Sequence, residues 1–145
     1  MGRFSARFLA ALVAGLLVLN CAATTTLQSV PAGATLDVKT SSQSALPRTE
    51  KYQVTTFGNF EFQAKTPGAE PFYGLLPLKF NGGYLALDIL FLAPLAFANL
   101  RSVYPFYEID LEKRVVRYKR KEADPWIEYM PKPPEAERAR KLFAE

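Results

Sequence analysis

The chain of 145 residues contains no histidine and a single cysteine. Without histidine, the Ser/His/Asp and Cys/His groupings of nucleophilic enzymes are excluded, and the commonest metal ligand is missing. One thiol and no imidazole also exclude a zinc site of ordinary ligand type. The glycines form no phosphate-binding loop, since Gly82-Gly83 has the character of a turn. We therefore expect no metal and no cofactor, and any catalysis would have to depend on carboxylates.

The beginning of the chain has three features of an export signal. Arg3 and Arg7 supply positive charge, and no acidic residue occurs before Asp37. Residues 8–19 form an apolar run of 12 residues, a length typical of a secretory signal and short for a membrane span. Cys21 stands where the run ends, directly after Asn20.

This arrangement resembles a bacterial lipoprotein signal peptide. In that family an aliphatic residue stands three positions before the cysteine, as Val18 does here, whereas Asn20 departs from the usual small residue. The resemblance implies cleavage of residues 1–20 and a diacylglyceryl thioether with an N-acyl chain on Cys21, which together give stable membrane attachment. Lipidation also accounts for an unpaired thiol in an exported protein. The alternative is a cysteine buried in an ordinary N-terminal helix.

The resemblance also implies a location. Ala22, rather than an aspartate, follows the cysteine, which in enteric lipoproteins implies the outer membrane, facing the periplasm. The membrane, through the anchor on Cys21, is therefore the first expected partner. Because an exported protein does not meet nucleic acid, we expect no nucleic-acid partner.

The rest of the chain has the length of one domain. Cleavage after residue 20 of the 145 would leave 125 residues, with 16 basic and 14 acidic side chains. The small polar residues of 21–33 predict a lipidated, mobile tether. Residues 34–130 are predicted to form a single α+β domain. Residues 131–145 are predicted to be a proline-rich tail with a short helix that has Pro134 in its first turn.

Alternating apolar and polar residues predict a mostly antiparallel β-sheet. Residues 31–34, with the sequence Pro-Ala-Gly-Ala, resemble the opening of PEGA-type β-domains and support a strand that follows them, with Leu36 and Val38 on one face. Residues 41–50 are predicted to be a polar loop, and Gly58-Asn59 a hairpin turn. The clearest hairpin is predicted over residues 106–121, with its turn at 112–114, followed by a short strand near residue 127.

Residues 84–100 form the most apolar stretch after the leader. As a helix these 17 residues would span about 26 Å against a hydrocarbon core of about 30 Å. Asp88 and Pro94 interrupt the stretch, so it is not a transmembrane span. We expect two short helices that meet at Pro94 and pack on the sheet as core. The alternative is a surface that rests on lipid beside the acyl anchor.

Glu108 and Asp110 are the one carboxylate pair with enzymatic potential. Two residues apart on a strand, they share a face about 6.6 Å apart, which would suit acid/base chemistry on a sugar. The alternative, which we favour, is a solvated strand face whose acids lie opposite basic residues of the returning strand. The sequence therefore predicts that the protein is not an enzyme.

Basic residues gather in the stretch that contains this returning strand. In an exported lipoprotein such a patch would contact anionic lipid headgroups, lipopolysaccharide phosphates or peptidoglycan carboxylates. The alternative is a set of charges that block edge-to-edge aggregation of the hairpin. The six cations are Lys113, Arg114, Arg117, Lys119, Arg120 and Lys121.

Two functions follow from these observations. The favoured one is a membrane-anchored bacterial envelope lipoprotein without catalytic activity, which has a structural role or binds an envelope protein, lipopolysaccharide or peptidoglycan. The alternative is an enzyme that acts on envelope polysaccharide through Glu108 and Asp110.

Overall fold

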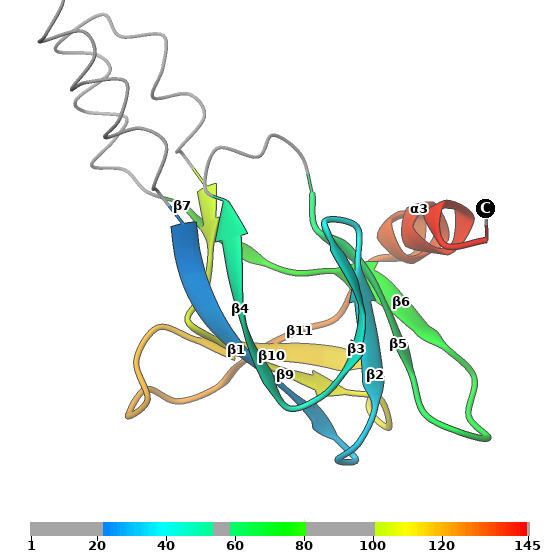
Figure 1. The fold of residues 1–145 in the computed structure, drawn as a ribbon, viewed down its shortest axis with the longest axis horizontal. Helices are drawn as coiled ribbons and strands as arrows, with labels where there is room; N and C mark the ends of the chain where they lie inside the picture. Colours follow the sequence, from blue (N-terminus) through cyan, green and yellow to red (C-terminus); the bar gives the residue numbers. More distant parts are fainter. Residues whose placement is uncertain (1–21, 54–58, 81–100, 145) are drawn as a thin grey trace, which may run out of the picture.

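The computed structural model describes residues 22–53, 59–80 and 101–144 (Figure 1). The predicted leader, Cys21, Gly58 and the apolar stretch 84–100 lie outside these residues. Within the described ranges the chain forms two β-sheets, a two-stranded ribbon and one helix.

The larger sheet has five strands in the order β11-β10-β9-β1-β4. Its strands are β1 (Ala22–Val30), β4 (Arg48–Gln53), β9 (Phe106–Asp110), β10 (Val115–Lys119) and β11 (Ile127–Tyr129). The smaller sheet has the order β3-β2-β5-β6, with strands β2 (Thr35–Val38), β3 (Ser41–Ala45), β5 (Glu61–Lys65) and β6 (Phe72–Leu75). The ribbon pairs β7 (Leu78–Phe80) with β8 (Arg101–Val103).

The described strands pair in antiparallel fashion, except that β1 and β9 are parallel. The predicted fold class is confirmed in its coarser part, a mostly antiparallel β structure with a short C-terminal helix. The finer part, an apolar helical segment over 84–100 packed on the sheet, lies outside the described residues.

The predicted mobile tether over 21–33 is wrong for Ala22–Val30. These residues form β1, an interior strand that pairs with β4 on one edge and with β9 on the other. Its run of three threonines is β-branched and favours an extended backbone. Thr25 and Leu27 are both fully buried. The sheet therefore includes Ala22, and the folded domain does not begin at residue 34.

The hydrophobic core lies between the inner faces of the two sheets. Leu27, Tyr107 and Val116 enter it from the larger sheet, whereas Leu36 and Phe62 enter it from the smaller one. Because successive side chains of a strand point to opposite faces, their neighbours along each strand point away from the core. The predicted alternation around Leu36 is thereby confirmed.

The hairpin prediction for the later part of the chain is confirmed, whereas the loop predicted over residues 41–50 is wrong. β9 and β10 form the predicted hairpin, and β11 is the short strand after it. The predicted loop 41–50 instead forms β3 and the beginning of β4. These strands lie at sheet edges, where polar side chains are common and the apolar signal is weak. The predicted turn at Gly58-Asn59 lies partly outside the described residues. The described strands on either side of it, β4 and β5, belong to different sheets.

The C-terminal helix α3 (Pro133–Leu142) packs against β5 and β6 (Figure 1). Glu135 accepts a hydrogen bond from the backbone N–H of Lys132 at 2.8 Å and stabilises the first turn. Pro131 crosses β6 so closely that a Cβ atom at Gly74 would lie 2.6 Å from its Cγ atom. Glycine at position 74 therefore permits the chain to reach α3. No helix among the described residues has the length and apolar character to cross a membrane.

Tyr107 joins three parts of the core. Its hydroxyl donates a hydrogen bond to the Pro77 carbonyl at 2.5 Å and accepts one from the Tyr104 backbone N–H at 2.9 Å. Burial raises the pKa of Tyr107 above its ordinary value. Burial and the Glu50 carboxylate raise the pKa of Tyr52 to about 12. The unfolded chain therefore releases these protons near pH 10, whereas the folded chain keeps them.

We predict that Tyr107→Phe lowers the free energy of unfolding at pH 7 by about 1–3 kcal/mol, because buried backbone groups lose their partner. A tyrosine whose pKa is raised by folding contributes fully to the free energy of unfolding below about pH 10. This contribution is lost as the pH rises toward the pKa of the tyrosine in the folded state. The wild type should therefore lose stability above pH 10 more steeply than the variant. Urea unfolding at a series of pH values measures both effects. Equal neutral-pH stability would contradict the role given to the hydroxyl.

Candidate functional site

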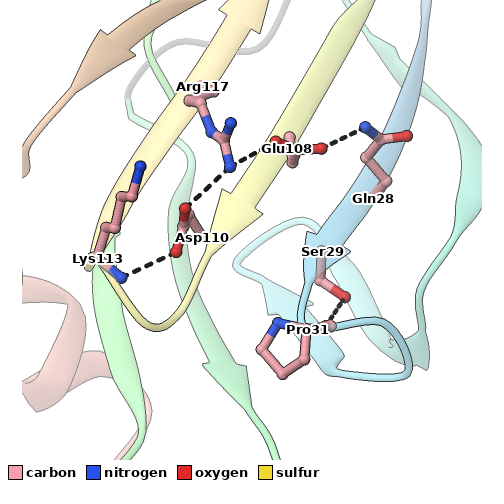
Figure 2. Close-up of polar contacts among 7 residues, drawn as sticks. All are labelled: Gln28, Ser29, Pro31, Glu108, Asp110, Lys113 and Arg117. Carbon is pink, nitrogen blue, oxygen red and sulfur yellow. Dashed lines mark hydrogen bonds and ion pairs between the residues drawn. The ribbon is translucent and has the colours of Figure 1, made fainter.

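Glu108 and Asp110 lie on the outer face of the larger sheet, as the two-residue spacing predicts. Ile109, which lies between them on β9, points into the core, as does Tyr107 before Glu108. β1 flanks the pair on one side and β10 on the other. Figure 2 shows both acids beside Arg117 of β10.

Each of the four carboxylate oxygens already has a partner. Arg117 Nη2 lies 2.8 Å from Glu108 Oε1 and 2.9 Å from Asp110 Oδ2. Gln28 donates a hydrogen bond to Glu108 Oε2 at 2.6 Å, and the Lys113 backbone N–H donates one to Asp110 Oδ1 at 2.8 Å (Figure 2). We call Gln28, Glu108, Asp110 and Arg117 the Arg117 cluster.

The Arg117 cluster ties three strands together. The predicted pairing of acids with bases of the returning strand is confirmed, because Glu108 lies opposite Arg117 in the β9–β10 register. The prediction that this strand face is solvated is wrong, since the Glu108 side chain is only 12% exposed and Asp110 is buried more deeply. The Asp110 side chain is only 3% exposed, so its charge depends on Arg117 and on the N–H at the turn. The sequence did not reveal Gln28, because its position opposite Glu108 follows from the parallel pairing of β1 with β9.

The six cations of the basic stretch do not form one patch. Arg117 belongs to the Arg117 cluster in the middle of β10. Lys113 and Arg114 are exposed in the turn before β10, whereas Arg120 and Lys121 are exposed after it. Lys119 Nζ lies 4.6 Å from the Trp126 ring centroid and 5.4 Å from that of Phe106. It also donates a hydrogen bond to the Glu122 carbonyl at 2.6 Å.

Two of these cations lie at a pocket that the sequence did not reveal. This pocket, here named the α3 pocket, has a volume of about 350 Å³. β6, the β9–β10 turn, the segment after β11 and α3 all contribute to it. Its walls are Phe72, Tyr73, Lys113, Arg114, Met130, Pro131, Ala136 and Arg140.

The α3 pocket combines apolar walls with cations. The guanidinium of Arg114 lies 5.6 Å from the Phe72 ring centroid, and that of Arg140 lies 5.5 Å from that of Tyr73. Arg114 also lies 3.4 Å from the Glu70 carboxylate, which is itself exposed. Such surroundings suit an anionic group attached to an apolar one, and the volume lies at the lower end for small-ligand pockets.

Two further features belong to the α3 pocket, an exposed methionine and an arginine with a left-handed backbone in the β9–β10 turn. Met130 is 68% exposed there, and an exposed, flexible apolar side chain adapts to varied partners. Arg114 has φ of 55°, a left-handed conformation that is uncommon for residues other than glycine. Neither this pocket nor the depression between the β2–β3 turn and the end of α3 is lined by Glu108 or Asp110.

In the part of the chain that the structure describes, no three side chains of the His, Cys, Asp or Glu type gather as a metal site would require. Comparisons with protein-family models, with curated proteins and with solved structures find no match for this chain. The site is therefore interpreted from its own geometry.

We predict that Arg117→Met lowers the free energy of unfolding by about 1.5–3 kcal/mol, the range for hydrogen bonds to charged groups. Arg120→Met, an equal loss of charge at an exposed position, should change it by less than about 0.5 kcal/mol. Urea unfolding of both variants measures the difference.

The double variant Arg117→Met with Asp110→Asn serves as a further control. Its loss of unfolding free energy should be smaller than the sum of the losses in the two single variants, because the interaction between the two residues can be lost only once. Additive effects would contradict the pairing of these two side chains.

Proposed function

We propose that this protein is a lipoprotein of the bacterial envelope, anchored through acylated Cys21, that binds an anionic partner and catalyses no reaction. The observation that carries the proposal is the α3 pocket, in which Lys113, Arg114 and Arg140 surround aromatic walls. A leader of the lipoprotein type supplies the anchor.

The anchor is supported by the sequence order at the start of the chain. The apolar run 8–19 ends at the only cysteine, Cys21, and small residues follow it. β1 begins at Ala22, so an acylated Cys21 would join the lipid to the sheet without an intervening linker. Such an anchor would restrict the orientation of the domain on the membrane.

The non-catalytic role is supported by the contacts of the two carboxylates. A general acid or base must exchange a proton with a substrate within hydrogen-bond reach. In the Arg117 cluster, the oxygens of Glu108 and Asp110 are all engaged by protein donors. These acids are therefore better suited to hold β1, β9 and β10 together than to act on a polysaccharide.

The position of the α3 pocket favours a partner in the aqueous compartment. The Leu111 backbone N–H donates to the Val30 carbonyl, so the turn that carries Lys113 and Arg114 lies at the Val30 end of β1. Eight residue steps separate Val30 from Ala22, which corresponds to about 26 Å along a strand. A carboxylate-bearing partner such as peptidoglycan fits this distance from the anchor better than the headgroups of the anchoring leaflet.

We predict that the wild type incorporates a fatty-acid analogue in metabolic labelling and that Cys21→Ala does not, because the thiol is the acylated group. The variant should also keep the mass of the uncleaved chain and leave the membrane fraction on alkaline extraction. Cys21→Ser provides a matched control that retains the size of the residue. Label on either variant would overturn the lipoprotein assignment.

We predict that Lys113→Ala with Arg140→Ala weakens co-sedimentation with purified peptidoglycan by at least tenfold. Each charged hydrogen bond that is lost costs about 1.5–3 kcal/mol, and tenfold corresponds to about 1.4 kcal/mol. Arg120→Ala with Lys121→Ala removes the same charge outside the pocket and should leave sedimentation close to that of the wild type. Equal losses in the two double variants would show that net charge, rather than the α3 pocket, governs binding.

A further inference from the structure

Several strands begin or end together at one end of the molecule. Ala22 of β1 lies opposite Gln53 of β4, and Phe80 of β7 lies opposite Arg101 of β8. β8 contacts β1, and Figure 1 shows the beginning of β1, the end of β4 and the β7–β8 ribbon at the same end. We call this region the anchor end because Cys21 directly precedes Ala22. Its described surface includes Ala22, Lys51, Lys79, Phe80 and Arg101.

Among the described residues of the anchor end, the charged side chains that are not paired within the chain are all basic. Lys51 and Arg101 are exposed and Lys79 is partly exposed. The nearest acid along β4 is Glu50, which is neutralised by Arg48 at 2.8 Å. An anionic surface would therefore be attracted to this end, and clustered cations beside a lipid anchor are the usual basis of such attraction.

The anchor end also carries an exposed aromatic ring. Phe80 is 59% exposed. Its apolar ring forms no hydrogen bond that would favour contact with water. Aromatic rings are enriched at the boundary between lipid headgroups and acyl chains. Cations around an exposed ring are thus the chemistry expected of a surface that contacts a bilayer.

We propose that the anchor end docks on the anionic headgroup surface of the membrane that holds the protein, with Phe80 in the interface and Lys51, Lys79 and Arg101 on lipid phosphates. The proposal rests on the proposed acylation of Cys21. One residue spans at most about 3.6 Å, so the anchor end cannot leave the headgroup layer once the lipid is inserted. The anchor and the surface therefore act on the same membrane.

Docking in this orientation fixes where the α3 pocket points. The β9–β10 turn of the pocket lies beside Val30 at the other end of β1, and Val30 is about 26 Å along the strand from Ala22. The Debye length at physiological ionic strength is about 8 Å, so the membrane charge would be screened at the pocket. The cations of the two ends would then serve different partners, lipid phosphates at the anchor end and a soluble or cell-wall anion at the pocket.

A single labelled position can test the orientation in the acylated, full-length mature protein. Because Cys21 is the only cysteine and acylation consumes its thiol, an introduced cysteine would be the only labelling site. Phe80→Cys places a polarity-sensitive fluorophore at the anchor end. Ala32→Cys, in the exposed turn after β1, places it at the opposite end as the matched control.

The probe is a vesicle of phosphatidylethanolamine and phosphatidylglycerol that contains a headgroup spin label as a quencher. We expect several-fold stronger quenching at position 80 than at position 32. Replacing Lys51, Lys79 and Arg101 by Gln should reduce the quenching at position 80. Replacing Arg120, Lys121 and Arg138 by Gln, an equal loss of charge at exposed positions outside both sites, should leave it unchanged.

The outcomes separate this inference from the proposed function. A free thiol at Cys21, with no flotation of the protein with vesicles, would overturn the acylation itself. Flotation with equal quenching at positions 80 and 32 would leave the anchor in place and overturn the docking of the anchor end. Flotation with an equal response to the two sets of Gln substitutions would overturn the role given to Lys51, Lys79 and Arg101.

Discussion

The pairing of β1 on both of its edges is the interaction on which the rest of this structure depends. β1 is hydrogen-bonded to β4 in antiparallel and to β9 in parallel orientation, so it joins the early and late parts of the chain in one sheet. Backbone bonds at 2.8 Å continue this contact beyond β9, from Thr26 to Pro105 and from Leu111 to Val30. The same strand contributes Leu27 to the core and Gln28 to the Arg117 cluster.

This position of β1 links the fold to the proposed function. A strand that is held on both edges cannot detach as a tether without breaking two ladders of hydrogen bonds. Its first residue follows Cys21, and the turn of the α3 pocket lies beside its last residue, Val30. The strand therefore sets both the distance and the direction between the proposed lipid anchor and the proposed binding pocket. Two groups of cations at opposite ends can then have different roles.

Residues of one chemical type were given different surroundings by the tertiary structure. The sequence placed six cations in one stretch. It also predicted that Glu108 and Asp110 pair with basic residues of the returning strand, and this pairing with Arg117 is local enough to be predicted from a hairpin. It did not indicate Arg140, Tyr73 or Met130, which lie on separate elements and meet only because α3 packs against β6. Alternation alone contains no information about that packing.

The sequence by itself determined the elements whose cause is local. The β9–β10 hairpin, the core-facing Leu36 and the proline-led helix α3 follow from alternation, turn residues and capping, which act over a few positions. Only the tertiary structure decided that 22–30 is an interior strand and that β4 and β5 belong to different sheets. The partners of these strands are distant in sequence, so their pairing is selected by the apolar surface that the whole chain buries and not by any local signal.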